Sequence, residues 1–227
     1  MEGAKAGDMR VDFFAIEKEK ASLLIKAAKK YSGGGAKMNS VFITIINMAL
    51  KRLYAAKEVN QNMLFSETAI NTRKQFGLED NALACYVTCL FETFDLNELT
   101  METFWKVAEK KSKNLHSIIG DMQEINKMYQ DVVSSLDVDE SGGYEQMVNF
   151  CTSNLGVMRN STGCIKVARE YLVAKVPHNY AMYFSIVSID GCQHWTMVHY
   201  KNLMSEETIK EFKKEFDAVV EELIKDL

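Results

Sequence analysis

One stretch of this sequence constrains the fold more than any other, because apolar side chains recur every three or four residues from Met38 to Leu53 without a break. This spacing places them along one side of an α-helix and predicts that the helix is buried. Asn39 or Ser40 is expected to cap its start. A chain of 227 residues is long enough to bury about 70% of its unfolded surface around such a helix without a metal or disulfide.

Weaker patterns on both sides of this helix predict a sheet and further helices. A helix is expected from Glu17 to Tyr31, ended by the glycines that follow Ser32, and Asp190-Gly191 is expected to turn a hairpin. The expected strands lie at 12–14, 63–72, 82–94, 148–156, 165–174, 180–189 and 194–200, and the other expected helices at 100–115, 121–136 and from Ser205 onward. This order predicts an α/β (α+β) fold, a mixed sheet with helices packed on one side. We expect residues 1–11 to form a flexible N-terminus and 12–227 a single domain.

Composition excludes several classes of protein. The 27 Lys and Arg against 31 Asp and Glu give a net charge of −4, so the chain lacks the basic surplus that nucleic-acid binding requires. No apolar run approaches the roughly 20 residues of a membrane span, and the polar start lacks a secretory signal. The five cysteines lack metal-ligand spacing and are expected to be reduced thiols in a cytoplasmic protein, with no tightly bound cofactor.

The order of elements and several short stretches resemble the C-terminal lobe of the chloramphenicol-acetyltransferase-like superfamily. Its members include nonribosomal-peptide condensation domains, alcohol acetyltransferases and polyketide-associated acyltransferases. The resemblance rests on the helix pair 17–31 and 38–54, the strand ending Asn71-Thr72-Arg73, the helix after Thr100, the turn Ser153-Asn154-Leu155-Gly156, and the closing hairpin followed by Ser205-Glu206-Glu207. It implies O- or N-acyl transfer, with acyl-CoA or a carrier-protein phosphopantetheine thioester as donor substrate.

The catalytic signature of that superfamily is missing from this sequence. Family enzymes use a histidine in an HHxxxD motif of their N-terminal lobe as the general base, which must be poised near neutral pH beside the acceptor. None of the four histidines here (His116, His178, His194 and His199) has that spacing. The resemblance therefore implies no catalytic residue in this chain, no turnover by the chain alone, and a partner N-terminal lobe.

The resemblance assigns substrate-binding roles to three residues, conditional on a partner lobe. Arg73 corresponds to the arginine that helps to hold the carboxylate of the motif, a role suited to a bidentate guanidinium. Asn154 and Gly156 correspond to the turn beside the active-site channel. The alternatives are a solvated arginine at a strand end and a plain turn, since Asn and Gly are common wherever the backbone needs a positive φ.

Other chemical groups carry weaker expectations. Cys85 and Cys89 are expected to be buried, unreactive thiols, and Cys151 lacks a neighbouring histidine that would activate it. His194 and His199 lie five residues apart on an expected strand, hence on opposite faces, and cannot hold one metal ion together. Two alternatives stay open: a non-catalytic interaction module that self-associates or pairs with a partner lobe, and a truncated gene product.

Overall fold

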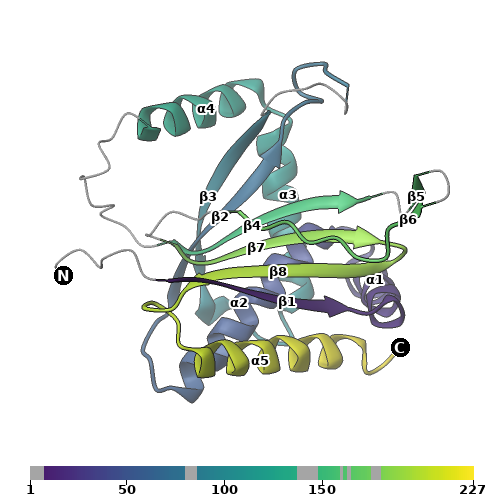
Figure 1. Ribbon diagram of the computed structural model, residues 1–227, viewed down its shortest axis with the longest axis vertical. Helices are drawn as coiled ribbons and strands as arrows, with labels where there is room; N and C mark the ends of the chain where they lie inside the picture. Colours follow the sequence, from purple (N-terminus) through teal and green to yellow (C-terminus); the bar gives the residue numbers. More distant parts are fainter. Residues whose placement is uncertain (1–7, 80–85, 137–147, 159–160, 163–164, 175–179) are drawn as a thin grey trace.

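The computed structural model describes residues 8–79, 86–136, 148–158, 161–162, 165–174 and 180–227 (Figure 1). Its strands are β1 (Met9–Ile16), β2 (Met63–Asn71), β3 (Val87–Asp95), β4 (Val148–Val157), β5 (Ser161–Thr162), β6 (Ile165–Lys166), β7 (Tyr180–Ile189) and β8 (Cys192–Tyr200). Its helices are α1 (Lys18–Ser32), α2 (Met38–Ala56), the 3₁₀ turn η1 (Leu96–Glu98), α3 (Phe104–Ile119), α4 (Met122–Leu136) and α5 (Glu206–Ile224).

The main sheet has six strands in the order β1-β8-β7-β4-β2-β3. Strand β4 runs parallel to both of its neighbours, β2 and β7, and the other pairs are antiparallel, so the sheet is mixed as predicted. Alternate side chains point to opposite faces of a strand. Phe150, Phe184 and Trp195 point to the face that packs against α2 and α5, and Ile70 packs against α4 on that same face. The predicted layer of helices on one side of a sheet is therefore confirmed.

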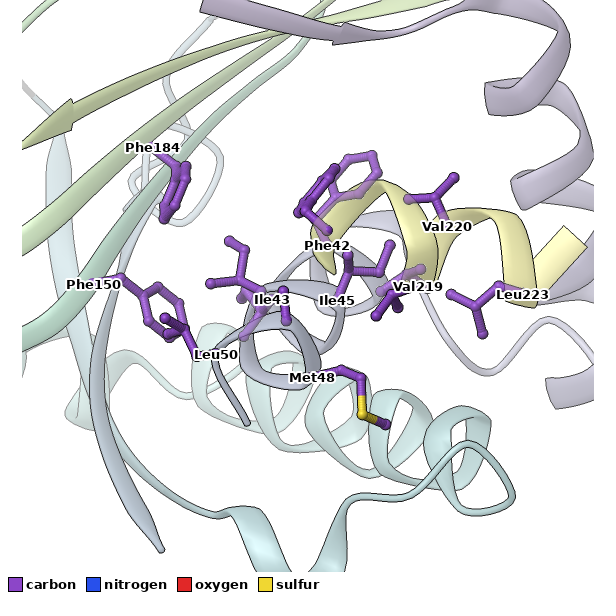
Figure 2. Packing of buried hydrophobic residues seen from close by; sticks show 14 of the residues in the cluster. Phe42, Ile43, Ile45, Met48, Leu50, Phe150, Phe184, Val219, Val220 and Leu223 are labelled. Carbon is purple, nitrogen blue, oxygen red and sulfur yellow. The ribbon is translucent and has the colours of Figure 1, made fainter. Parts of the chain in front are cut away.

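Helix α2 lies at the centre of the core, as its spacing predicts. Phe150 and Phe184 of the sheet face Ile43 and Leu50 of α2, and Val219 of α5 closes the other side (Figure 2). All five side chains are at least 97% buried. The expected caps are wrong, because Lys37 occupies the N-cap position and no side chain caps the helix.

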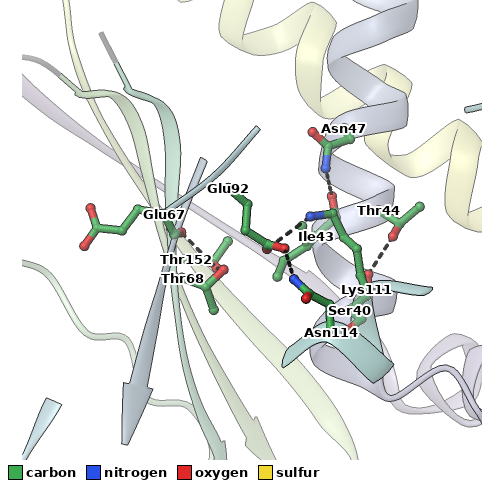
Figure 3. Close-up of polar contacts among 10 residues, drawn as sticks. All are labelled: Ser40, Ile43, Thr44, Asn47, Glu67, Thr68, Glu92, Lys111, Asn114 and Thr152. Atoms are coloured by element: carbon green, nitrogen blue, oxygen red, sulfur yellow. Dashed lines mark hydrogen bonds and ion pairs between the residues drawn. The ribbon is translucent and has the colours of Figure 1, made fainter. Parts of the chain in front are cut away.

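Several polar side chains of the helices are hydrogen-bonded, either within α2 or to the sheet. Thr44 and Asn47 donate to carbonyl oxygens one turn earlier in α2 (Figure 3). On α3, Lys111 pairs with Glu92 of β3 at 3.1 Å, and Asn114 donates to the same carboxylate at 3.0 Å. Both charged side chains of this pair are at most 17% exposed, so the pair ties α3 to the outer strand of the sheet.

Several sequence-based boundaries differ from the structure. Strand β1 begins at Met9, inside the segment 1–11 that was expected to be flexible, and residues 1–7 lie outside the described residues. Only Ile165–Lys166 of the strand expected at 165–174 is extended in a ladder. The rest crosses the sheet face opposite the helices, where Ser185 donates a hydrogen bond to the carbonyl of Leu172 and Tyr171 contacts Phe13. Tyr171 of this segment therefore packs against a neighbouring strand, whereas Leu172 and Val173 are 39% and 46% exposed.

The strand expected at 82–94 begins at Val87 in the structure, and its residues 82–85 lie outside the described part of the chain. The closing hairpin and the final helix are confirmed: Asp190 and Gly191 both have positive φ, and Ser205 caps α5. No helix in the described ranges is long and apolar enough to cross a membrane.

Candidate functional site

Arg73 lies two residues after the end of β2, where the chain turns away from the sheet. Its side chain is half-buried. Among its contacts, Nη1 donates to Oδ1 of Asn71 at 3.2 Å and the guanidinium stacks on the ring of Tyr86 at 5.6 Å. A guanidinium held by an amide and an aromatic ring is preorganised in one orientation, which suits recognition of a carboxylate.

Asn154 and Gly156 lie in β4, and the tight turn expected there is instead a β-bulge. The register between β4 and β7 shifts between Asn154 and Val157, and pairing resumes at Val157 with Ser188. Gly156 has φ +76, and its N–H donates to Oδ1 of Asn154 at 2.9 Å. The positive φ occurs at Gly156 and not at Asn154, and the strand continues because β7 still pairs with it.

The structure places these predicted residues at the ends of two parallel strands. β2 and β4 pair through Ser66, Glu67 and Thr68 opposite residues 150–152, so both strands run toward the same end of the sheet. Beyond this short ladder the two strands separate (Figure 1). Arg73 therefore follows one branch of the sheet, whereas Asn154 and Gly156 belong to the branch that continues beside β7.

A buried carboxylate lies at the start of this divergence, and the sequence analysis missed it. Glu67 is only 6% exposed and points away from α2 (Figure 3). The hydroxyl of Tyr180 donates to its Oε2. Burial, followed by this hydrogen bond, raises the pKa of Tyr180, so the phenol stays protonated and remains a donor. The signal in the sequence was the polar run Ser66-Glu67-Thr68 inside an otherwise apolar strand.

The thiol of Cys151 lies beside this carboxylate. Burial and the charge of Glu67 both raise the pKa of Cys151, and the thiol side chain is 5% exposed. A nucleophilic cysteine needs the opposite environment, one that lowers its pKa. The structure thus supports the expectation that Cys151 is unreactive. Cys89 is half-buried, and Cys85 and Cys164 lie outside the described residues.

The described histidines lie on α3 and β8. His116 is exposed near the end of α3. His194 and His199 lie on opposite faces of β8, as predicted: the ring of His194 contacts Tyr171, whereas Nε2 of His199 lies 3.3 Å from Oδ2 of Asp12. His178 lies outside the described ranges. Among the described side chains, no group of three or more His, Cys, Asp or Glu residues is placed to hold a metal ion.

Comparison with known proteins identifies the fold. No family model matches the sequence, and no curated protein does. Solved structures do match over almost the whole chain, and they are condensation-type domains and acyltransferases. The chain therefore has the fold of a lobe of the CoA-dependent acyltransferase type, as its element order predicts.

Three of these structures illustrate the similarity. The TRI3 trichothecene 15-O-acetyltransferase from Fusarium sporotrichioides matches with a TM-score of 0.74 and 13% identity over 97% of this chain and 48% of its own. The condensation domain of the Monacolin K polyketide synthase MokA matches with a TM-score of 0.66 and 11% identity over 96% of this chain and 48% of its own. The epimerization domain TycB3(E) of tyrocidine synthetase B matches with a TM-score of 0.65 and 13% identity over 96% of this chain and 48% of its own. This chain thus spans about half the length of each.

Proposed function

We propose that this chain is the C-terminal lobe of an acyltransferase that moves an acyl group from CoA or a carrier-protein phosphopantetheine thioester to a hydroxyl or amine. The observation that carries the proposal is the match of 97% of this chain to 48% of an O-acetyltransferase. In such an assembly the N-terminal lobe supplies the general base. Acyl-CoA or the phosphopantetheine thioester is then a substrate that passes through the site, and no tightly bound cofactor is needed.

Within that assembly Arg73 orients the carboxylate of the partner lobe's HHxxxD motif. Its support is the half-buried guanidinium fixed between Asn71 and Tyr86 at the end of β2. Asn154 and Gly156 line the acyl-donor channel. At this bulge Asn154 offers its side-chain amide, and Gly156 lets the donor approach the backbone because it has no side chain. The Asn154 amide nitrogen is the group that reaches the acyl carbonyl, since Oδ1 already accepts from the Gly156 N–H.

A direct test is incubation of the purified chain with acetyl-CoA and a panel of alcohols and amines while free thiol is measured. We expect no acceptor-dependent thiol release, because none of the four histidines has the spacing of the HHxxxD motif that supplies the general base in this superfamily. The matched control is His116→Ala, which removes an exposed imidazole on α3. Thiol release that needs an acceptor and is lost in this variant would contradict the assignment of the base to another lobe.

The transcript upstream of the codon for Asp12 provides the complementary test. An upstream lobe with an HHxxxD motif would allow the two-lobe protein to be assayed with Arg73→Ala, Arg73→Lys and, as the control, Lys74→Ala. We expect Arg73→Ala to lower kcat by about 100-fold, Arg73→Lys to recover part of that loss, and Lys74→Ala to have no effect, because only the guanidinium is positioned by Asn71. Equal activity of all variants would remove Arg73 from the site.

One observation favours the second candidate function, a non-catalytic interaction module. Leu155 and Val157 at the end of β4 are 44% and 86% exposed. Apolar side chains that project from a strand end suit contact with another chain or with a second copy of this one. Size-exclusion chromatography with light scattering separates the cases: a monomer at all concentrations and salt levels argues against self-association, and Val157→Lys should dissociate any dimer that forms through this strand.

A further inference from the structure

A pocket of about 660 Å³ opens on the sheet face opposite the helices, at the turn of the β7–β8 hairpin. Its floor is formed by β1 and β8, one side by the start of α1, and the other side by the segment 166–171 that crosses the sheet. None of the residues assigned above to acyl transfer lines it. Its volume falls in the range of pockets that bind small molecules.

His194 lies at the base of this pocket with both ring nitrogens unused. The side chain is 4% exposed, and neither Nδ1 nor Nε2 has a hydrogen-bond partner among the described residues. Buried polar groups in proteins are almost always paired. Other buried polar atoms in the described part of the chain also lack partners, but His194 is the only one of those residues that lines the pocket. A ligand in the pocket would supply the missing hydrogen bonds.

Positive charge is available beside this imidazole. Arg169 and Lys166 line the pocket and make no ion pair with any described residue. Lys18, by contrast, lies 4.0 Å from Asp190. Burial lowers the pKa of His194, the charge of Arg169 lowers it further, and the charge of Glu17 acts in the opposite direction without reversing the shift. A neutral ring keeps one N–H donor, and an unpaired guanidinium is the protein's best partner for a carboxylate.

Aromatic side chains form the outer wall of the pocket. The rings of Phe13 and Tyr171 lie 4.6 Å apart, and Tyr171 also packs edge-on against His194 at 5.5 Å. Phe13 is 48% exposed, which leaves apolar surface at the mouth of the pocket. An apolar group placed there would cover this ring.

These features define one class of ligand. We propose that the pocket binds a small apolar monocarboxylate, with its carboxylate between Arg169 and the N–H of His194 and its apolar body against Phe13 and Tyr171. Glu17, which also lines the pocket, disfavours ligands with a second negative charge. The inference stands on groups of this chain alone and does not depend on the proposed acyl transfer.

Benzoate is a suitable probe, with benzamide as its neutral match. Titration calorimetry of the whole chain should show benzoate binding with a dissociation constant on the order of 1 mM, and at least about tenfold weaker binding of benzamide, since the amide cannot use the guanidinium. Arg169→Gln should weaken benzoate binding by about tenfold as well. Arg169 is exposed, so this variant is expected to fold. The control is His116→Gln, which replaces an exposed histidine of α3 that does not line the pocket. This variant should bind benzoate as the unmodified chain does.

A second readout does not depend on any variant. The ring-nitrogen resonances of His194 in the unmodified chain should shift on titration with benzoate, while those of His199 on the opposite face should not. No binding of benzoate, equal binding of benzamide, or undiminished binding by Arg169→Gln would overturn the proposal. Neither measurement involves acyl-CoA. A negative result would therefore not bear on the proposed acyl transfer, which the thiol-release assay tests separately.

Discussion

At the scale of single residues, the least usual feature of this protein is the carboxylate of Glu67 inside the sheet. An ionised carboxylate in a protein interior is destabilising unless hydrogen bonds compensate for the lost water. The structure supplies the hydroxyl of Tyr180 as a donor, and the thiol of Cys151 lies next to it. Hydrogen bonds to charged groups contribute more than those between neutral groups, which makes this contact a sensitive point for mutation.

We expect Tyr180→Phe to lower the free energy of unfolding at pH 7 by about 2–3 kcal/mol, because the substitution leaves the Glu67 carboxylate buried without its main donor. The double variant Glu67→Gln/Tyr180→Phe should recover part of this loss, since an uncharged amide is less costly to leave unpaired. Tyr31→Phe, at a 42% exposed tyrosine, is the matched control. Urea unfolding followed by circular dichroism measures all three, and equal midpoints for Tyr180→Phe and Tyr31→Phe would contradict the argument.

The same tyrosine predicts a dependence of stability on alkaline pH. Its pKa in the folded protein is raised above the ordinary value of about 10, chiefly by burial and then by the hydrogen bond to Glu67. The unfolded chain therefore loses this proton first, so the stability that Tyr180 contributes is complete below pH 10 and is lost as pH rises above it. The stability difference between the unmodified chain and Tyr180→Phe should shrink by about 1.4 kcal/mol per pH unit there. A difference that stays constant to pH 11 would contradict the raised pKa.

At the scale of elements, the final helix depends on a cap that the sequence already indicated. The side chain of Ser205 accepts a hydrogen bond from the N–H of Thr208 at 3.1 Å, and Glu206 and Glu207 add negative charge to the first turn. Ser205→Ala should therefore lower stability by about 1 kcal/mol, whereas Ser205→Asp, which keeps an acceptor, should stay close to the unmodified protein. Thermal unfolding of the two variants side by side tests this, and equal losses would show that the cap contributes nothing.

Elements that depend on the local sequence pattern could be predicted, whereas elements that depend on contacts with distant strands could not. The apolar spacing of α2, the left-handed glycine after α1 and the Asp190-Gly191 hairpin are local signals, and each appears in the structure as expected. The bulge at Asn154 depends instead on whether β7 continues to pair with β4. Residues 167–174 are apolar enough for a strand, but no local property indicates that they cross the sheet.

The candidate sites show the same division. The resemblance assigned candidate roles to Arg73, Asn154 and Gly156 because each belongs to a short stretch of the sequence. The pairing of Glu67 with Tyr180 joins residues 113 positions apart, and the pocket around His194 is built from three separate segments, 13–18, 166–171 and 189–194. Such sites form only when the chain folds, so the sequence can mark Glu67 as an unusual polar residue in a strand but cannot show which distant residue it pairs with.

At the scale of the whole molecule, one hydrophobic core connects the sheet with α1, α2, α3 and α5. Trp195 lies at its centre, with no measurable exposure and with the rings of Phe14, Phe42, Phe184 and Phe216 between 5.0 and 6.2 Å away. Helix α4 differs, because its described apolar side chains belong to a separate small cluster with Ile70. Disruption of the main core should therefore unfold the sheet, α1, α2, α3 and α5 together. Helix α4 is the element most able to open by itself.

The two tryptophans of the chain make this testable. Trp105 of α3 is stacked on Tyr31 and only partly buried, so Trp105→Phe leaves Trp195 as the single fluorescent reporter of the core. We expect urea transitions followed by Trp195 fluorescence and by far-ultraviolet circular dichroism to have the same midpoint, as a two-state unit requires. Amide exchange in α4 should nevertheless be faster than in α2, because opening α4 exposes only its small cluster. A fluorescence midpoint clearly below that of circular dichroism would mean that the sheet and the helices do not share one cooperative core.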